Sequence, residues 1–302
     1  MKHPTATPPT DEGFCLIRND CFFRIQRKLG LIPETGLGIG RRALFWSMLA
    51  WLPLVIWSAV TGHLVASDGQ TESLLQHFGV HVRALVAIPL FILAEGLSHR
   101  TTHRLLPYFP DSGLISERDI PKYRQIVLDL KRLRDSSLPW VGIVGLLLAR
   151  LTLPLASGEM HELSWADTTT GQAMAQYGFG GWWFLYVTRT IFLVLCLAWF
   201  WRLALLGILL SRIARLDLAI VPTHPDGVGG LGFLQQMPKA FAPVVFALSS
   251  VTAAKWAHDA AYHAQSVIEL KILMIGFVVL VLGIFLLPYL VFSGILITAK
   301  HE

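Results

Sequence analysis

The chain has little charge and few cysteines. Only 15% of its 302 residues are Asp, Glu, Lys or Arg, against about a quarter in a typical soluble domain. Apolar residues make up 54% and the mean hydropathy is +0.55, which excludes a disordered chain. Glycine shows no triplet period, and three cysteines are too few for a disulfide scaffold. The composition therefore predicts an integral membrane protein.

The cysteines and the net charge exclude two further classes. Cys15 and Cys21 precede the first apolar run and Cys196 lies inside another, so no pair has the spacing of a zinc knuckle or an extracellular bridge. We expect three reduced thiols. The net charge of +5 comes from basic residues beside apolar runs, where they set orientation in a bilayer. Nucleic acid is not an expected partner.

Six stretches are long and apolar enough to be read as membrane crossings, since a helix needs about 20 residues to span a hydrocarbon core of about 30 Å. The sequence thus predicts an all-α bundle of six transmembrane helices in a domain of residues 43–299. The six spans are 43–65, 82–98, 138–156, 182–210, 238–257 and 271–298.

Two polar segments flank these spans. The N-terminal arm, residues 1–42, carries Phe22, Ile25 and Leu29 at helical spacing, which predicts a short interfacial helix. The insert 99–137 has an amphipathic pattern after Ser116 and Asp119, which resemble a capping box. Both are expected to be surface helices.

The distribution of Lys and Arg predicts the orientation. The arm and the insert are rich in them, whereas residues 158–181 contain acidic residues and no Lys or Arg. Because basic flanks resist translocation, both termini are expected in the cytoplasm. We expect a homo-oligomer in the lipid bilayer of a bacterial inner membrane.

Ionisable residues inside the spans are costly and need a reason. Arg150 and Arg189 fall near the midplane at similar depth, with Glu95 on the second span and Arg202 near a span end. One reading is that Glu95 pairs with an arginine and pins helix packing. The other is a hydrated, electropositive pathway formed by Arg150, Arg189 and Glu95, with Arg83 at its outer mouth. That reading predicts a channel or carrier for a small, anionic solute.

Six of the eleven histidines fall at or beyond the outer span ends: His63, His77, His81, His161, His258 and His263. His77 and His81 are four apart and would share a helix face, and Asp259 lies beside His258. Imidazole and carboxylate suit zinc, copper or iron, with Asp68, Glu72 and Glu269 available to support the ligands. The alternative function is therefore a membrane metalloprotein or redox enzyme. Ordinary interfacial histidines are the simpler reading, and a pH-sensing role at the outer mouth is a further alternative.

The least generic string joins the fourth and fifth spans, from Pro222 to Phe233. It lacks the features of a phosphate loop or a dinucleotide fingerprint. It is either a structural re-entry loop or the inner mouth of a pathway with glycine amides that bind an anion. The residues concerned are His224, Asp226, Gly227, Gly229 and Gly230.

A third reading is a non-catalytic assembly or sensor subunit that signals through residues 116–136. No arrangement of a nucleophile with its base can be recognised from spacing, so we predict no catalytic residues.

Overall fold

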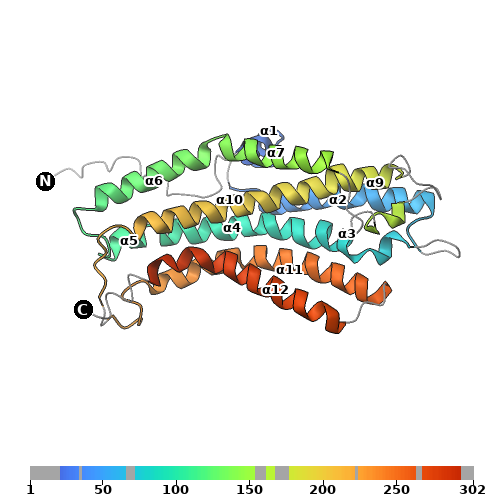
Figure 1. Cartoon of the computed structure of the whole chain (residues 1–302). Helices are drawn as coiled ribbons and strands as arrows, with labels where there is room; N and C mark the ends of the chain where they lie inside the picture. The colour runs from blue at the N-terminus through green and yellow to red at the C-terminus, as the bar shows by residue number, and fades with distance from the viewer. Residues whose placement is uncertain are drawn as a thin grey trace.

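The structure is a computed structural model that describes residues 21–33, 36–65, 72–153, 161–166, 177–221, 224–262 and 267–293. The regular secondary structure within these ranges is helical, apart from isolated bridge residues, among them Ile115 paired with Leu218. The helical elements (Figure 1) are α1 (Cys21–Lys28), α2 (Ile39–Thr61), η1 (Leu74–Gln76), α3 (Phe78–Val82), η2 (Arg83–Ala87), α4 (Ile88–Leu105), α5 (Tyr108–Asp111), α6 (Ile120–Asp135), α7 (Leu138–Thr152), η3 (Ser164–Ala166), α9 (Phe179–Trp183), η5 (Phe184–Thr188), α10 (Arg189–Ile213), η6 (Gly232–Gln236), α11 (Met237–Tyr262), α12 (Val267–Leu286) and η7 (Leu287–Tyr289).

Five helical segments of the described chain are long and apolar enough to cross a membrane. The expectation of an all-helical integral membrane protein is thereby supported. The five segments are Ile39–Thr61, Phe78–Asp111, Phe179–Ile213, Gly232–Tyr262 and Leu270–Tyr289.

The remaining predicted span corresponds to α7, which is only 15 residues long and gives way to extended backbone at Leu153. Residues 154–156 of that span lie outside the described residues. Figure 1 shows α6 and α7 following one another along the bundle, so that they carry the chain from the end near α5 back to the end near α9. Many apolar side chains of α7 are exposed, including Leu138, Val141 and Leu146.

Two helices run well beyond the predicted spans. The predicted span 82–98 is part of one helical segment over residues 78–111, and 182–210 is part of another over 179–213. At about 1.5 Å per residue each is about 50 Å long, more than a hydrocarbon core requires. The first of them includes residues 99–111, which are the beginning of the insert predicted at 99–137. The basic residues there lie on a continuation of the helix.

The smaller differences occur at helix ends. The predicted span 43–65 begins at Ile39 and ends at Gly62, whose φ of 79° is the left-handed conformation common at helix C-termini. The predicted span 271–298 begins earlier, at Val267, is α-helical to Leu286 and 3-10-helical over Leu287–Tyr289, and is helical again over residues 291–293. Residues 294–298 lie outside the described residues.

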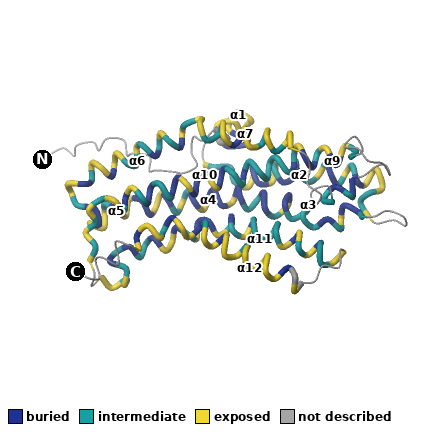
Figure 2. The backbone as a smooth tube through the Cα atoms, viewed as in Figure 1, coloured by how far each residue is buried: buried dark blue, intermediate teal, exposed yellow. Residues whose placement is uncertain are grey.

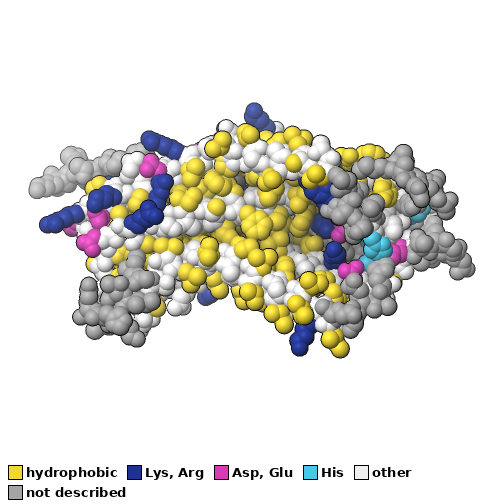
Figure 3. Space-filling view, in the orientation of Figure 1, with side chains coloured by type: hydrophobic (Ala, Val, Ile, Leu, Met, Phe, Trp, Pro, Cys, Tyr) yellow, Lys and Arg dark blue, Asp and Glu magenta, His cyan; other side chains and the backbone are white. Residues whose placement is uncertain are grey.

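The two ends of the bundle differ in chemistry. We call residues 62–83, 161–166 and 255–262, where they are described, the histidine end. We call residues 99–137 and 212–236 the arginine end. Figure 3 shows apolar side chains over the middle of one face, with charged side chains toward both ends and, among the described residues in this view, His at the right-hand end only.

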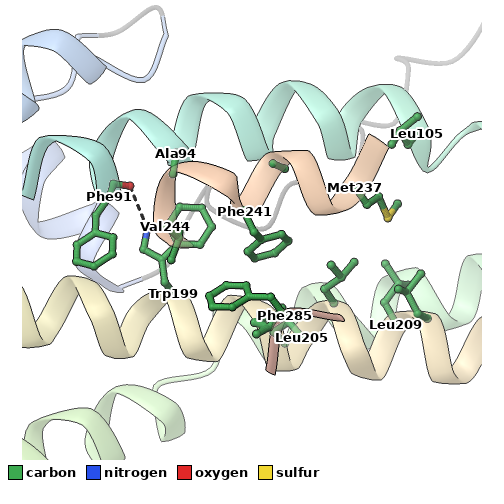
Figure 4. Close-up of a cluster of buried hydrophobic side chains, with 14 of the residues drawn as sticks. Phe91, Ala94, Leu105, Trp199, Leu205, Leu209, Met237, Phe241, Val244 and Phe285 are labelled. Atoms are coloured by element: carbon green, nitrogen blue, oxygen red, sulfur yellow. Dashed lines mark hydrogen bonds between the residues drawn. The ribbon is translucent and has the colours of Figure 1, made fainter. Parts of the chain in front are cut away.

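The main core lies between α4, α10 and α11 (Figure 4). Trp199 Nε1 donates a hydrogen bond of 3.0 Å to the carbonyl oxygen of Phe91, and the Trp199 ring meets Phe241 edge-on at 5.7 Å. These contacts join α10 to both α4 and α11. In contrast, α12 exposes most of its side chains (Figure 2), as expected for a helix that faces lipid.

A second cluster packs the histidine end. Trp165 is fully buried and lies edge-on to Trp57 at 6.0 Å and to Phe184 at 6.4 Å. Its Nε1 donates to the carbonyl oxygen of Glu162 at 2.9 Å. Trp165 therefore fixes residues 161–166 against α2 and η5.

Candidate metal centre

Three segments that are distant in sequence bring a carboxylate and three imidazoles together at the histidine end. Glu72 precedes η1, His161 precedes η3, and His258 lies near the end of α11. His77 sits between η1 and α3. The ligand atoms of Glu72, His161 and His258 all lie within 4.8 Å of one another.

Local structure orients the Glu72 segment. Ser73 and Gln76 form a reciprocal capping box around η1, with the Ser73 amide donating to Gln76 Oε1 at 2.8 Å. The Leu74 amide donates to the carbonyl oxygen of His63 at 2.9 Å, and the Leu74 side chain is fully buried. The turn is thus held from both sides, which directs Glu72 toward α11.

The carboxylate of Glu72 is the centre of the cluster. His161 Nε2 lies 3.6 Å from Oε1, and His258 Nε2 lies 3.8 Å from Oε2. His77 Nε2 is closer, at 2.8 Å from Oε2, and the Ser164 hydroxyl donates to the same oxygen at 2.6 Å. His77 and Ser164 therefore orient the carboxylate, while His161 and His258 face it from a longer distance.

The tautomer of His258 follows from its surroundings. Nδ1 lies 2.8 Å from the carbonyl oxygen of Gln76, and a carbonyl only accepts, so Nδ1 carries the hydrogen. In the neutral ring, Nε2 then carries a lone pair, and this nitrogen faces Glu72. Metal-ligating histidines have this arrangement, with the second ring nitrogen donating to a backbone carbonyl.

The electrostatics keep Glu72 charged and His77 neutral. Burial raises the pKa of Glu72, but the Ser164 hydrogen bond and the nearby imidazoles, His77 first, outweigh it and the pKa falls below its ordinary value. Burial, opposed by the charge of Glu72, lowers the pKa of His77 to about 4. At neutral pH a neutral His77 therefore donates to an anionic Glu72.

A cavity of about 160 Å³ opens beside the cluster. This exceeds the roughly 10–15 Å³ that one water requires. Candidate metal ligands and two cationic side chains line this cavity. Its lining includes His77, Arg83, His161, Glu162, Thr252, Lys255, His258 and Asp259.

The predicted metal ligands fall into three groups. His77 and His258 do come together, and Asp259 lines the adjoining cavity. His81 lies apart, because α3 begins at Phe78 and His77 precedes the helix, so the two do not share a face. The ring nitrogens of His81 bond Trp51 Nε1 and the carbonyl oxygen of Leu74, each at 3.0 Å. His263 lies outside the described residues.

Sequence reasoning missed His161 as a partner of His258 and placed Glu72 only in a supporting role. The signal available was that all three lie in connections or at a helix end on one side of the bundle. Which of six histidines meet depends on Trp165 and η1, whose packing is a tertiary property.

The predicted pathway residues lie in different surroundings. Glu95 is fully buried, with Oε2 2.6 Å from Arg42 Nη1 and Oε1 2.9 Å from Arg202 Nη2. Arg83 lines the cavity at the histidine end. Arg150 and Arg189 line one groove of about 30 Å³ between α7 and α10.

In the loop predicted at residues 222–233, backbone amides bind the carboxylate of Asp226, a residue of the same loop. The amides of Val228, Gly230 and Gly232 donate to the Asp226 carboxylate at 2.8–3.1 Å. His224 Nδ1 lies 2.8 Å from the same carboxylate. The glycine residues at positive φ, Gly227, Gly229 and Gly230, allow the chain to wrap around it. These amides are therefore not presented to a solute.

Comparison of the chain with models of known protein families, with curated proteins and with solved structures gives no match. The functional argument therefore depends on the geometry of the site.

Proposed function

We propose that the chain is a membrane metalloprotein that binds one divalent metal ion through Glu72, His161 and His258, with Zn²⁺ as the preferred ion. The observation that carries the proposal is that two imidazole Nε2 atoms face the two oxygens of one carboxylate at 3.6 and 3.8 Å. Zinc ligands at about 2.0–2.2 Å from a tetrahedral ion lie about 3.3 Å apart. The ligand atoms of the three residues lie within 4.8 Å of one another, so the three side chains would draw together to close around an ion.

The surrounding groups support this ligand set. His258 donates Nδ1–H to the carbonyl oxygen of Gln76, and its Nε2 lies 3.8 Å from Glu72 Oε2. Ser164 and His77 bond Glu72 and fix its orientation. Two histidines and a carboxylate leave at least one coordination position open, and the cavity beside the cluster gives it access to small molecules.

Metal analysis tests the proposal. The full-length protein, purified in detergent and washed with chelator, is reloaded with Zn²⁺, and bound zinc is measured per chain. We expect one equivalent for the wild type and a loss of bound zinc in Glu72→Gln, His161→Gln and His258→Gln. His81→Gln is the matched control, because Trp51 and Leu74 hold that ring away from the cluster. One retained equivalent in all three ligand variants would contradict the proposal.

We also propose six crossings with both termini in the cytoplasm of a bacterial cell, so that the histidine end faces outward. The path of α6 and α7 supports it, since these helices return the chain along the bundle (Figure 1). The test is labelling by a membrane-impermeant maleimide in intact cells. In a cysteine-free chain, Glu162→Cys is expected to react and Glu117→Cys to react only after lysis; the reverse pattern would invert the topology.

Passage of a small anion is the second candidate. It is favoured by one observation: Arg150 and Arg189, from separate helices, line the same groove. Purified protein in liposomes would then show an anion flux that falls in the Arg150→Ala, Arg189→Ala double variant. Equal flux from both proteins would remove this candidate.

A further inference from the structure

Arg83 is a buried cation on the wall of the cavity beside the proposed metal site. Arg83 is 8% exposed, and its guanidinium carbon lies 5.4 and 5.5 Å from the ring centroids of Phe184 and Phe192. Nη2 makes one long contact, 3.4 Å to Glu162 Oε1. Nε and Nη1 have no hydrogen-bond partner among the described residues. Buried charged donors of this kind are costly unless a ligand or water completes them.

The backbone around Arg83 is irregular in two neighbouring helices. Arg83 is the first residue of the π-helical turn η2, and Phe184, which its guanidinium covers, is the first residue of the π-helical turn η5. Such turns are rare and often occur at functional sites. Here they bring the arginine, which lines the cavity, against the rings of Phe184 and Phe192.

The charges of the cavity favour an anion once a metal ion is present. Lys255 is exposed and lines the same cavity as Arg83, together with the carboxylates of Glu162 and Asp259. With Glu72 ionised and a divalent ion bound, the formal charges of these groups leave one net positive charge. Glu162 and Asp259 would repel the anion, and the ion with Arg83 would outweigh them.

We propose that the cavity binds a small oxyanion, a molecule with carboxylate or phosphoryl oxygens, with one oxygen on the metal ion and another on the guanidinium of Arg83. This rests on the proposed metal site. A guanidinium donates strong, charge-assisted hydrogen bonds to the oxygens of such a group. The cavity volume of about 160 Å³ admits an anion larger than one water. The anion would supply the missing partners of Arg83 and fill the open coordination position.

Cobalt substitution tests the proposal on the full-length protein. Co²⁺ takes the place of Zn²⁺, and its visible absorption reports the ligands of the ion. Inorganic phosphate and acetate are titrated separately, which distinguishes phosphoryl from carboxylate preference. We expect a saturable spectral change with at least one of them. Arg83→Gln is expected to weaken that binding about tenfold to a hundredfold, since a charge-assisted hydrogen bond is lost.

Two further variants keep the result interpretable. Arg83→Lys retains the charge without the fork and is expected to lose less affinity. Arg212→Gln removes one positive charge at the arginine end, where Arg212 Nη1 lies 3.8 Å from Asp129, and is expected to bind like the wild type.

The outcomes separate the two proposals. If the wild type takes up no Co²⁺, the metal site itself fails. If Co²⁺ binds and neither anion changes its spectrum, the metal site stands and the oxyanion site is overturned. An unchanged anion affinity in Arg83→Gln overturns the role of Arg83.

Discussion

Arg42 Nη1 lies 2.6 Å from Glu95 Oε2 in a wholly buried ion pair between α2 and α4. Arg202 of α10 approaches the other carboxylate oxygen at 2.9 Å. The three side chains are 1%, 0% and 3% exposed, so one carboxylate joins three helices. Replacing a buried ion pair as a whole can be neutral, but removing one partner leaves an uncompensated charge.

Glu95→Gln is therefore expected to destabilise the protein by about 3–5 kcal/mol, because two buried arginines lose their anion. Thermal unfolding in detergent measures the effect. Asp129→Asn is the control, since its contacts to Arg132 and Arg212 are 3.8 Å long and exposed, and we expect a change below about 1 kcal/mol. Equal shifts in the two variants would show that the Glu95 pairs contribute no more than surface contacts.

Gln26 connects α1 to the same ion pair. Its Oε1 accepts from Arg42 Nε at 2.6 Å and from Trp46 Nε1 at 3.1 Å, and the residue is fully buried. Gln26→Ala leaves buried donors of Arg42 and Trp46 without this acceptor, which we expect to cost about 1–3 kcal/mol and to expose α1 to protease. Gln125→Ala, whose hydrogen bond to Asp129 is exposed, should leave α1 protected. Protection of α1 in both variants would contradict the docking role.

The sequence predicted the helices better than the contacts between them. Long apolar runs are visible without tertiary information, because the bilayer imposes their length. The pairing of Glu95 with an arginine was one of two readings, but its partner Arg42 was assigned to the polar arm. That assignment placed the start of the predicted span at residue 43, whereas α2 begins at Ile39 and buries Arg42.

The histidine cluster shows the same limit. His77 and His258 were proposed together from their place at span ends, and they do stack at 4.7 Å. The spacing of His77 and His81 suggested a shared face, yet the helix begins only at Phe78. His161 meets His258 because Trp165 anchors its segment, and no local pattern contains that information.

Ser164 is expected to support metal affinity without being a ligand. Its hydroxyl donates to Glu72 Oε2 at 2.6 Å and lies 3.1 Å from His77 Nε2. Ser164→Ala should weaken Zn²⁺ binding about 10–100-fold, as is usual when a group that orients a ligand is removed. Competition with a chromophoric chelator measures the affinity. Ser112→Ala, at the arginine end, serves as the control, and an unchanged affinity in Ser164→Ala would contradict the orienting role.

Asp226 is expected to stabilise the loop at the arginine end in a pH-dependent manner. Burial raises its pKa, but the amides of Gly230, Val228 and Gly232 and the His224 side chain outweigh it and hold the pKa well below its ordinary value. The unfolded chain therefore takes up the proton first as the pH falls, and the contribution of Asp226 is complete above about pH 4 and lost below it.

The melting temperatures of the wild type and Asp226→Asn, compared from pH 7 to pH 3, check this sign. The wild type should melt higher at pH 7, and the difference should shrink as the pH falls below about 4. Glu117→Gln, at an exposed position, should match the wild type throughout. A difference that grows toward low pH would refute the assignment.

Gly180 is expected to tolerate no side chain, because a Cβ there would overlap the ring of Trp57. Trp57 lies edge-on to Trp165 at 6.0 Å, and Trp165 anchors the segment that carries His161. Gly180→Ala should therefore cost about 1–3 kcal/mol of stability and weaken Zn²⁺ binding through the displaced segment. Gly145→Ala on α7 is the matched control, since nothing lies within 4 Å of its Cβ. Melting temperature and zinc affinity are measured for both variants, and identical values would show that the Trp57 contact does not position the histidine end.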